Sequence, residues 1–289
     1  MNYDGDIIRP PSEANSIILQ VTVGCSHNRC TFCGAYKEKK FRIRSQEEVL
    51  DNIAFAARYC GKQKRVFLAD GDVLILSQKR LVALFELIRE NLPQVNRIAL
   101  YGNAKAIRAK TVDELKELKR LGLHRIYMGL ESGANEVLAA VKKDETDKSM
   151  ALAACRAKKA GVFLSVTVLL GLGGVQNSLH HARETARVLS LMEPKQIAAL
   201  CLMPLSNTDL GRQYQEGTFE LPDSTGILLE LQELLLNITC YPVQFMANHA
   251  SNYLPLSGRL PRDREAMLNS VKMALLGNQP LVPERFRAL

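Results

Sequence analysis

The sequence predicts an α/β protein whose core is a partial (β/α)6 TIM-like barrel with a C-terminal α+β extension. Two observations indicate this class. Six apolar runs rich in β-branched residues recur about every 30–50 residues, as expected for strands buried on both faces of a parallel sheet. Helical patterns separate these runs, which predicts repeated strand–helix–strand units. A flat, doubly wound sheet is the main structural alternative.

Each repeat begins with a predicted strand. The helices between the strands have readable starts, because Ser45 with Glu48, and Thr111 with Glu114, have the spacing of a capping box. The predicted strands are the runs at residues 16–23, 65–70, 97–101, 125–131, 162–170 and 197–203.

The pattern changes after the barrel repeats. Residues 224–237 predict a strongly apolar helix, residues 241–248 a short strand, and residues 262–276 a second helix. We therefore expect residues 1–215 to form the barrel core, and residues 216–289 to form an extension that packs on it within the same domain.

The composition is that of an ordinary globular protein, with 47% hydrophobic and 24% charged residues. No apolar run is long enough to cross a bilayer, so we expect no membrane partner. The first residues lack the basic start and apolar stretch of a secretory signal, which predicts a cytoplasmic location. The net charge of +8 is spread along the chain. Its one dense basic run, at residues 37–40, is typical of a solvated loop rather than a nucleic-acid-binding surface.

Seven cysteines in a chain of this kind argue against a disulfide framework, because the number is odd and three of the seven lie within nine residues. That cluster, Cys25, Cys30 and Cys33, indicates metal ligation. The other four cysteines stand in apolar stretches and are predicted to be small buried hydrophobes. They are Cys60, Cys155, Cys201 and Cys240.

The three clustered cysteines directly follow the first predicted strand, with the spacing C-x4-C-x2-C. Three thiolates in a short loop can hold three irons of a [4Fe–4S] cluster and leave the fourth iron open. The alternative is a zinc site of the Cys3His type, since His27 lies between the first two cysteines. The position at the carboxyl end of a barrel strand, where barrel active sites gather, favours the cluster.

This loop resembles that of the radical SAM (S-adenosylmethionine) superfamily, although the family usually has three residues in the first gap and this sequence has four. Two later segments agree in type and order. Residues 129–133, GLESG, resemble the signature of the branch that includes oxygen-independent coproporphyrinogen oxidase and the methylthiotransferases. Residues 167–174 resemble the family's glycine motif on the fifth strand. The resemblance covers residues 16–205, and the whole chain looks like small stand-alone members of unassigned role.

The resemblance implies a [4Fe–4S] cluster on Cys25, Cys30 and Cys33, with SAM beside it. Phe32 and Leu169 inherit positions that meet the adenine, and Glu131 inherits one that accepts from the SAM ammonium or ribose. Lys142 or Lys143 is a candidate for the SAM carboxylate. The residues expected at the cofactor are Phe32, Asp70, Asp72, Asn103, Glu131, Ser132, Leu169 and Gly171.

The activity implied by the resemblance is reductive cleavage of SAM to a 5′-deoxyadenosyl radical, which abstracts hydrogen from a small-molecule substrate. An external one-electron donor of the flavodoxin or ferredoxin type is then a required partner. Three alternatives stay open. The first is an enzyme that cleaves SAM for methyl or sulfur transfer, although the lack of a second cysteine group disfavours sulfur insertion. The others are a zinc-stabilised nucleic-acid-binding module, and a haem or cluster carrier that resembles these enzymes without their reaction.

A polar cluster follows the predicted strand at residues 241–248. His249, Asn252 and Tyr253 in this cluster are the candidates for contact with the substrate, and a capped turn is an equally good explanation of the same residues. His180 and His181 lie on a patterned helix and are predicted to be structural.

Overall fold

The computed structural model describes residues 1–239 and 241–288. These form two compact units. The first contains residues 1–28, 35–128 and 155–164, and the second contains residues 29–34, 129–154, 165–239 and 241–288.

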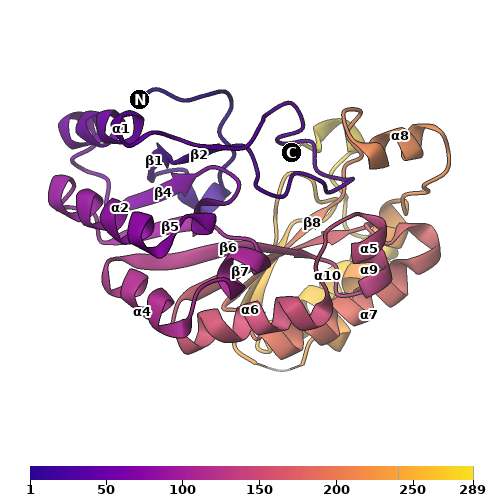
Figure 1. The fold of residues 1–289 in the computed structure, drawn as a ribbon. Coiled ribbons are helices and arrows are strands. Elements are labelled where there is room, and N and C mark those ends of the chain that lie inside the picture. Colours follow the sequence, from indigo (N-terminus) through magenta and orange to yellow (C-terminus); the bar gives the residue numbers. More distant parts are fainter. Residues whose placement is uncertain (240, 289) are drawn as a thin grey trace. The chain divides into compact units, whose positions relative to one another are not determined.

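Parallel strands form the centre of the first unit. Strand β1 (Ile17–Gln20) pairs with β4 (Arg65–Ala69), β4 with β5 (Arg97–Tyr101), and β5 with β6 (Leu123–Glu131). The register places Ile17 beside Val66 and Val66 beside Ile98. Figure 1 shows β4 and β5 side by side. A short antiparallel pair, β2 (Thr22–Val23) with β3 (Arg42–Ile43), precedes the first helix.

Amphipathic helices pack around these strands. Their buried stripes include Ile53 on α1, and Leu81 and Phe85 on α2, while Phe67 and Leu100 are buried on the strands. Burial of such side chains is the main stabilising contribution in this unit. The helices of the first unit are α1 (Gln46–Tyr59), α2 (Gln78–Asn91), α3 (Ala104–Arg108) and α4 (Val112–Arg120).

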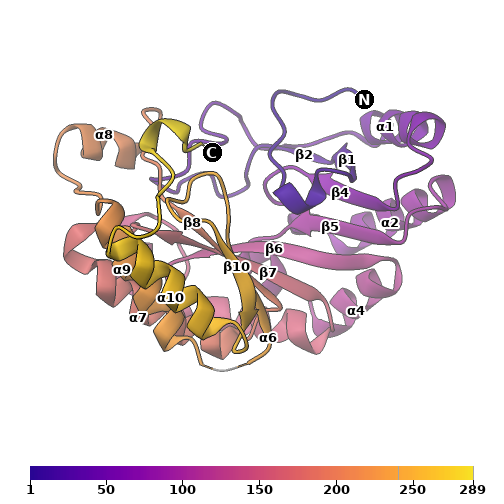
Figure 2. The ribbon, with the colours of Figure 1, turned by 180° about the vertical axis from the view of Figure 1, so that it is seen from behind.

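The second unit continues the same alternation. Strand β7 (Phe163–Leu170) is parallel to β8 (Gln196–Cys201), and β8 is parallel to β9 (Val243–Ala247), whereas β10 (Leu256–Leu260) is antiparallel to β9. Helix α9 packs against both α7 and α10 (Figure 2). The helices that lie wholly in this unit are α5 (Asn135–Ala140), α7 (Gly174–Met192), α8 (Asp209–Gln215), α9 (Ser224–Asn237) and α10 (Arg264–Leu275). Helix α6 (Asp147–Lys159) and strands β6 and β7 contribute residues to both units.

The predicted α/β class, both capping boxes and five of the six predicted strands are confirmed. Residues 16–23, predicted as one strand, instead form β1 and β2, which pair with β4 and β3 in different sheets. Helix α9 matches the predicted residues 224–237, and β9 and α10 lie within the other two predicted segments. Sequence analysis missed five short elements, each of 7 residues or fewer: β3, β10, α3, α5 and α8. The division of the chain at residue 216 stays a prediction. Within the described residues, no helix has the length and apolarity of a membrane span.

The prediction for the scattered cysteines is only partly right. Cys201 is buried, Cys60 is half-buried, and Cys155 is exposed. The prediction for Cys155 was wrong because its neighbours in sequence on α6 are apolar on several faces of the helix. The structure buries Ala153 and Ala154, whereas Cys155 lies on the exposed face. Cys240 lies outside the described residues.

Candidate active site

The cysteine loop follows β2 and contributes residues to both units. Cys25 belongs to the first unit, and Cys30 and Cys33 belong to the second. None of the described cysteines forms a disulfide, and these three are partly exposed. Within residues 1–239 and 241–288, no three His, Cys, Asp or Glu side chains are arranged around a common metal position. Three thiolates at this spacing fit the ligand chemistry of a cluster, and ligation by these cysteines stays a prediction.

Asp72 holds the first half of the loop. Its Oδ2 accepts hydrogen bonds from the Ser26 hydroxyl at 2.6 Å and from Asn103 Nδ2 at 2.7 Å. The Asp72 side chain is buried, and burial raises its pKa to about 6 although these hydrogen bonds oppose the shift. Because Ser26 adjoins Cys25, Asp72 fixes the backbone next to the first thiol.

Asp70 acts in the same way on the other side of the loop. The Tyr36 hydroxyl donates to its Oδ1 at 2.5 Å, and Gln20 Nε2 donates to its Oδ2 at 3.4 Å. Burial raises the pKa of Asp70, against the effect of these two donors. Between the two carboxyls, a Cβ added at Gly71 would lie 3.0 Å from the Cβ of Cys25, so the end of β4 closely approaches this cysteine.

Asn103 has structural partners for both ends of its amide. Its Oδ1 accepts from the Ala106 backbone N–H at 2.7 Å and so caps α3, while its Nδ2 donates to Asp72. The expected contacts of Asp70, Asp72 and Asn103 with SAM stay predictions. The described contacts give these three residues a positioning role at the cysteine loop.

In the second unit, Glu131 and Lys143 form a buried ion pair near two of the cysteines. Lys143 Nζ lies 2.9 Å from Glu131 Oε1, and the two side chains are 14% and 11% exposed. Burial lowers the pKa of Lys143, but the negative charges of Glu131, Cys30 and Cys33 outweigh burial and raise it above its ordinary value. Lys143 is therefore the positive charge that faces this part of the loop.

The local backbone explains the glycines of the GLESG segment. Glu131 has a φ of 64°, and its carboxylate folds back over residue 129, where a Cβ would collide with it. At Gly133 a Cβ would collide with the backbone of α7 at Glu184, and the Gly133 N–H donates to Thr185 Oγ1 at 2.9 Å. One glycine leaves room for the carboxylate, and the other lets α7 approach the strand end.

Ser132 is buried and belongs to a polar network inside the second unit. Its hydroxyl lies 2.8 Å from His181 Nδ1, and His181 Nε2 lies 3.0 Å from the Leu169 carbonyl oxygen. Leu169 and Phe32 both pack, half-buried, against one apolar cluster that includes Val141. The structure thus brings the predicted adenine positions, Phe32 and Leu169, to the same cluster.

The three substrate candidates differ in their surroundings. His249 is half-buried, and its Nδ1 accepts from the Ser251 backbone N–H at 3.1 Å. Asn252 is buried and donates to the Ala199 carbonyl at 2.9 Å, while its Oδ1 has no hydrogen-bond partner in the described structure. Tyr253 donates to Glu284 at 2.7 Å on the exposed side. Contact of any of them with substrate stays a prediction.

Sequence reasoning missed Ser26 and Glu230 as structural partners of the site. Glu230 had a readable signal, because it is an acid inside the apolar stripe of α9, three residues after Ile227 and four before Leu234. Ser26 had none, since a serine between two loop cysteines is equally suited to solvent.

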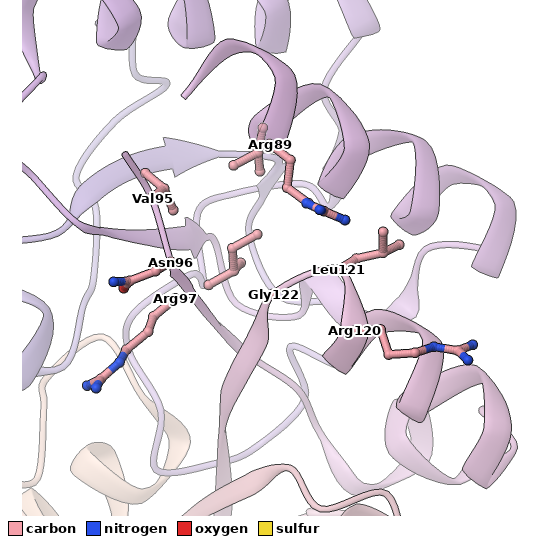
Figure 3. A pocket seen from close by; sticks show the side chains of 9 residues that line it. Arg89, Val95, Asn96, Arg97, Arg120, Leu121 and Gly122 are labelled. Atoms are coloured by element: carbon pink, nitrogen blue, oxygen red, sulfur yellow. The ribbon is translucent and has the colours of Figure 1, made fainter. Parts of the chain in front are cut away.

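A separate hollow of about 190 Å³ lies in the first unit (Figure 3). Its lining includes Arg97 at the start of β5 and Gly122 just before β6, so it lies at the amino ends of these strands. The guanidinium groups of Arg97 and Arg120 extend in opposite directions there. The hollow is therefore not part of the site at the carboxyl ends.

The fold and the cysteine loop define an enzyme of the iron–sulfur and SAM-dependent class. Residues 19–187, more than half of the chain, match the model of the radical SAM superfamily, and the chain belongs to that family. Members of this family are enzymes that use a [4Fe–4S] cluster and SAM for radical chemistry, and the matches to two curated relatives span only 27% and 32% of those proteins. Family membership favours this chemistry over the zinc-module and carrier alternatives.

Three known proteins illustrate the likeness. The chain is 23% identical over 199 residues to 4′-phospho-dehydrooxetanocin synthase of Priestia megaterium, a match that covers 62% of this chain and 27% of that protein. Coproporphyrinogen III oxidase of Escherichia coli superposes with a TM-score of 0.58 at 18% identity, over 78% of this chain and 52% of that one. For methylornithine synthase the TM-score is 0.56 at 15% identity, with coverages of 89% and 70%. These structures confirm the TIM-like partial-barrel class.

Proposed function

We propose that this protein cleaves SAM reductively at a [4Fe–4S] cluster held by Cys25, Cys30 and Cys33. The observation that carries the proposal is the three-cysteine loop directly after β2, in a chain that matches the radical SAM family from residue 19. When bound, the cluster and SAM together supply a 5′-deoxyadenosyl radical that abstracts hydrogen from a small-molecule substrate.

The protein's own residues bind and orient these groups. Asp72 holds Ser26 in the first half of the loop, and Asp70 holds Tyr36, which follows the last of the three cysteines. Such contacts set the geometry that cluster ligation requires. Because each carboxyl is buried and already bonded to the protein, its role is to position the loop.

The Glu131–Lys143 pair suits the amino-acid end of SAM. That end carries one carboxylate and one ammonium, and the pair offers a cation and an anion 2.9 Å apart. Phe32 and Leu169 supply half-buried apolar surface for a flat ring such as adenine. An external donor of the flavodoxin or ferredoxin type delivers the electron in this proposal.

The test is anaerobic purification followed by iron, sulfide and product analysis. Wild-type protein with SAM and dithionite should release 5′-deoxyadenosine and contain iron and sulfide in equal amounts. The Cys30→Ala variant should lose most of the iron, because one of three ligands is gone, whereas Cys155→Ala, which removes an exposed thiol, should retain it.

Two results would contradict the proposal. One is a fully reconstituted protein that yields no SAM cleavage product. The other is stoichiometric zinc without sulfide. With cleavage established, transfer of deuterium from labelled metabolites into 5′-deoxyadenosine identifies the substrate.

A further inference from the structure

We propose that Glu230, on α9 of the C-terminal extension, is a positioning residue that fixes the Leu169–Gly171 turn for SAM binding. This inference rests on the proposed function, since that turn is the segment expected at the adenine. It gives the extension a role in cofactor binding.

The carboxylate of Glu230 joins the turn after β7 to the start of α7. Its Oε1 accepts from the Gly171 backbone N–H at 2.8 Å, and its Oε2 accepts from the Ser178 hydroxyl at 2.5 Å. The residue is completely buried. A backbone N–H buried in a turn needs an acceptor, and here the only one recorded among the described residues is supplied by another helix.

The turn itself is shaped to receive α9. Gly171 has a φ of +86°, and a Cβ there would lie 2.9 Å from the side chains of both Ile227 and Leu221. Ile227 is one helical turn before Glu230 on α9. The extension therefore packs directly on the backbone that it also hydrogen-bonds.

His181 connects the same turn to the end of β6. Burial lowers its pKa to about 4, so the imidazole is neutral near pH 7. A carbonyl oxygen can only accept, so Nε2 must donate to Leu169 and Nδ1 must accept from the Ser132 hydroxyl. The ring thus has one tautomer, which ties Leu169 to the GLESG segment.

A purely structural role is a poor explanation of Glu230. A buried carboxylate is costly, and an apolar side chain would fill the stripe of α9 at lower cost. The imidazole of His181, whose Nε2 lies 3.4 Å from Glu230 Oε1, does not compensate the charge, because it is neutral near pH 7. What the carboxylate adds is two acceptor atoms placed at the turn and at α7.

The experiment compares Glu230→Leu and Glu230→Gln with wild type, as holoenzymes of equal iron content. Leu removes both acceptors, so we expect the dissociation constant and KM for SAM to rise on the order of tenfold or more. Gln keeps an acceptor for Gly171 and a partner for Ser178, so it should restore most of the affinity. Glu233→Leu, which removes a half-buried carboxylate of α9 that pairs with Arg183 and not with Gly171, is the matched control and should leave both constants unchanged.

A second readout does not depend on activity. Hydrogen exchange of the Gly171 amide should accelerate in Glu230→Leu and stay slow in Glu230→Gln. If Glu230→Leu lowers the melting temperature but leaves the SAM dissociation constant and this amide unchanged, Glu230 is only structural and the inference is overturned. Wild-type holoenzyme that binds no SAM would instead refute the proposed function, which separates the two failures.

Discussion

Removal of Lys143 should destabilise the protein more than removal of its partner Glu131. The perturbations are Lys143→Met, Glu131→Gln and the double variant. Lys143→Met removes the cation that faces Glu131, Cys30 and Cys33, and it leaves the Glu131 carboxylate buried without its partner. Glu131→Gln leaves Lys143 charged but still facing those two thiolates, so part of its stabilisation remains.

The magnitude follows from the depth of the pair. With a separation of 2.9 Å and side chains only 14% and 11% exposed, loss of one partner should lower the free energy of unfolding by about 3–5 kcal/mol. For a chain of this size that corresponds to a fall in melting temperature of roughly 6–10 °C. Loss of both partners should cost less than the sum of the single losses, with a coupling energy of about 2 kcal/mol or more.

The assay is thermal unfolding of anaerobic holoenzymes matched in iron content. Lys142→Met is the control, because its side chain is 63% exposed and lies 3.9 Å from Asp209, a pair that should contribute less than about 1 kcal/mol. Two results would contradict this account of the charges. One is an equal loss of unfolding free energy in the two single variants, and the other is a loss in the double variant that equals the sum of the single losses.

Three further outcomes are expected. Burial raises the pKa of Glu230 from 4.5 to about 7, so its contribution to stability is complete below pH 4.5 and is lost as the pH rises through 7. The melting temperature of wild type minus that of Glu230→Gln should therefore fall between pH 5 and 8, by an amount equivalent to about 3 kcal/mol. A difference that does not change with pH would contradict this. Arg287→Ala removes a guanidinium that lies 3.8 Å from the Tyr253 ring centroid and should speed hydrogen exchange of the backbone around Tyr253 at least several-fold. Unchanged exchange would mean that Arg287 does not hold the segment around Tyr253 in place. Ser26→Ala leaves Asp72 with one donor fewer and should lower the free energy of unfolding by about 1.5–3 kcal/mol in denaturant titrations, and a change below about 0.5 kcal/mol would argue against Asp72 as an anchor of the loop.

The fold was predictable where local patterns are long and periodic. Helix α9 and the capping box at Ser45 were predicted because apolar spacing and capping chemistry are local properties of the chain. Strands β3 and β10 were missed because each is short and is stabilised by its antiparallel partner, β2 or β9, rather than by its own sequence. Cys155 shows the converse error, since an apolar neighbourhood in sequence did not predict which face of α6 is buried.

The site was predictable as residue types and strand ends, but not as partners. Glu131 and Leu169 could be found because they occupy motif positions at the ends of strands. That Lys143 rather than Lys142 would meet Glu131 depends on the turn after α5, where Lys142 adopts a φ of 52°. The link from Glu230 to Gly171 spans 59 residues, and only the tertiary structure brings the two together.

The position of Glu131 requires both a left-handed backbone conformation and a carboxylate that reaches Lys143, and no amino acid suits both requirements well. Glycine or asparagine would adopt its φ of 64° more readily, but neither carries a carboxylate, and aspartate is one methylene too short to keep the same reach to Lys143. A redesign that considered only backbone conformational preference would replace Glu131. The position therefore marks a trade-off between stability and chemistry, and directed evolution for thermostability should hold it constant.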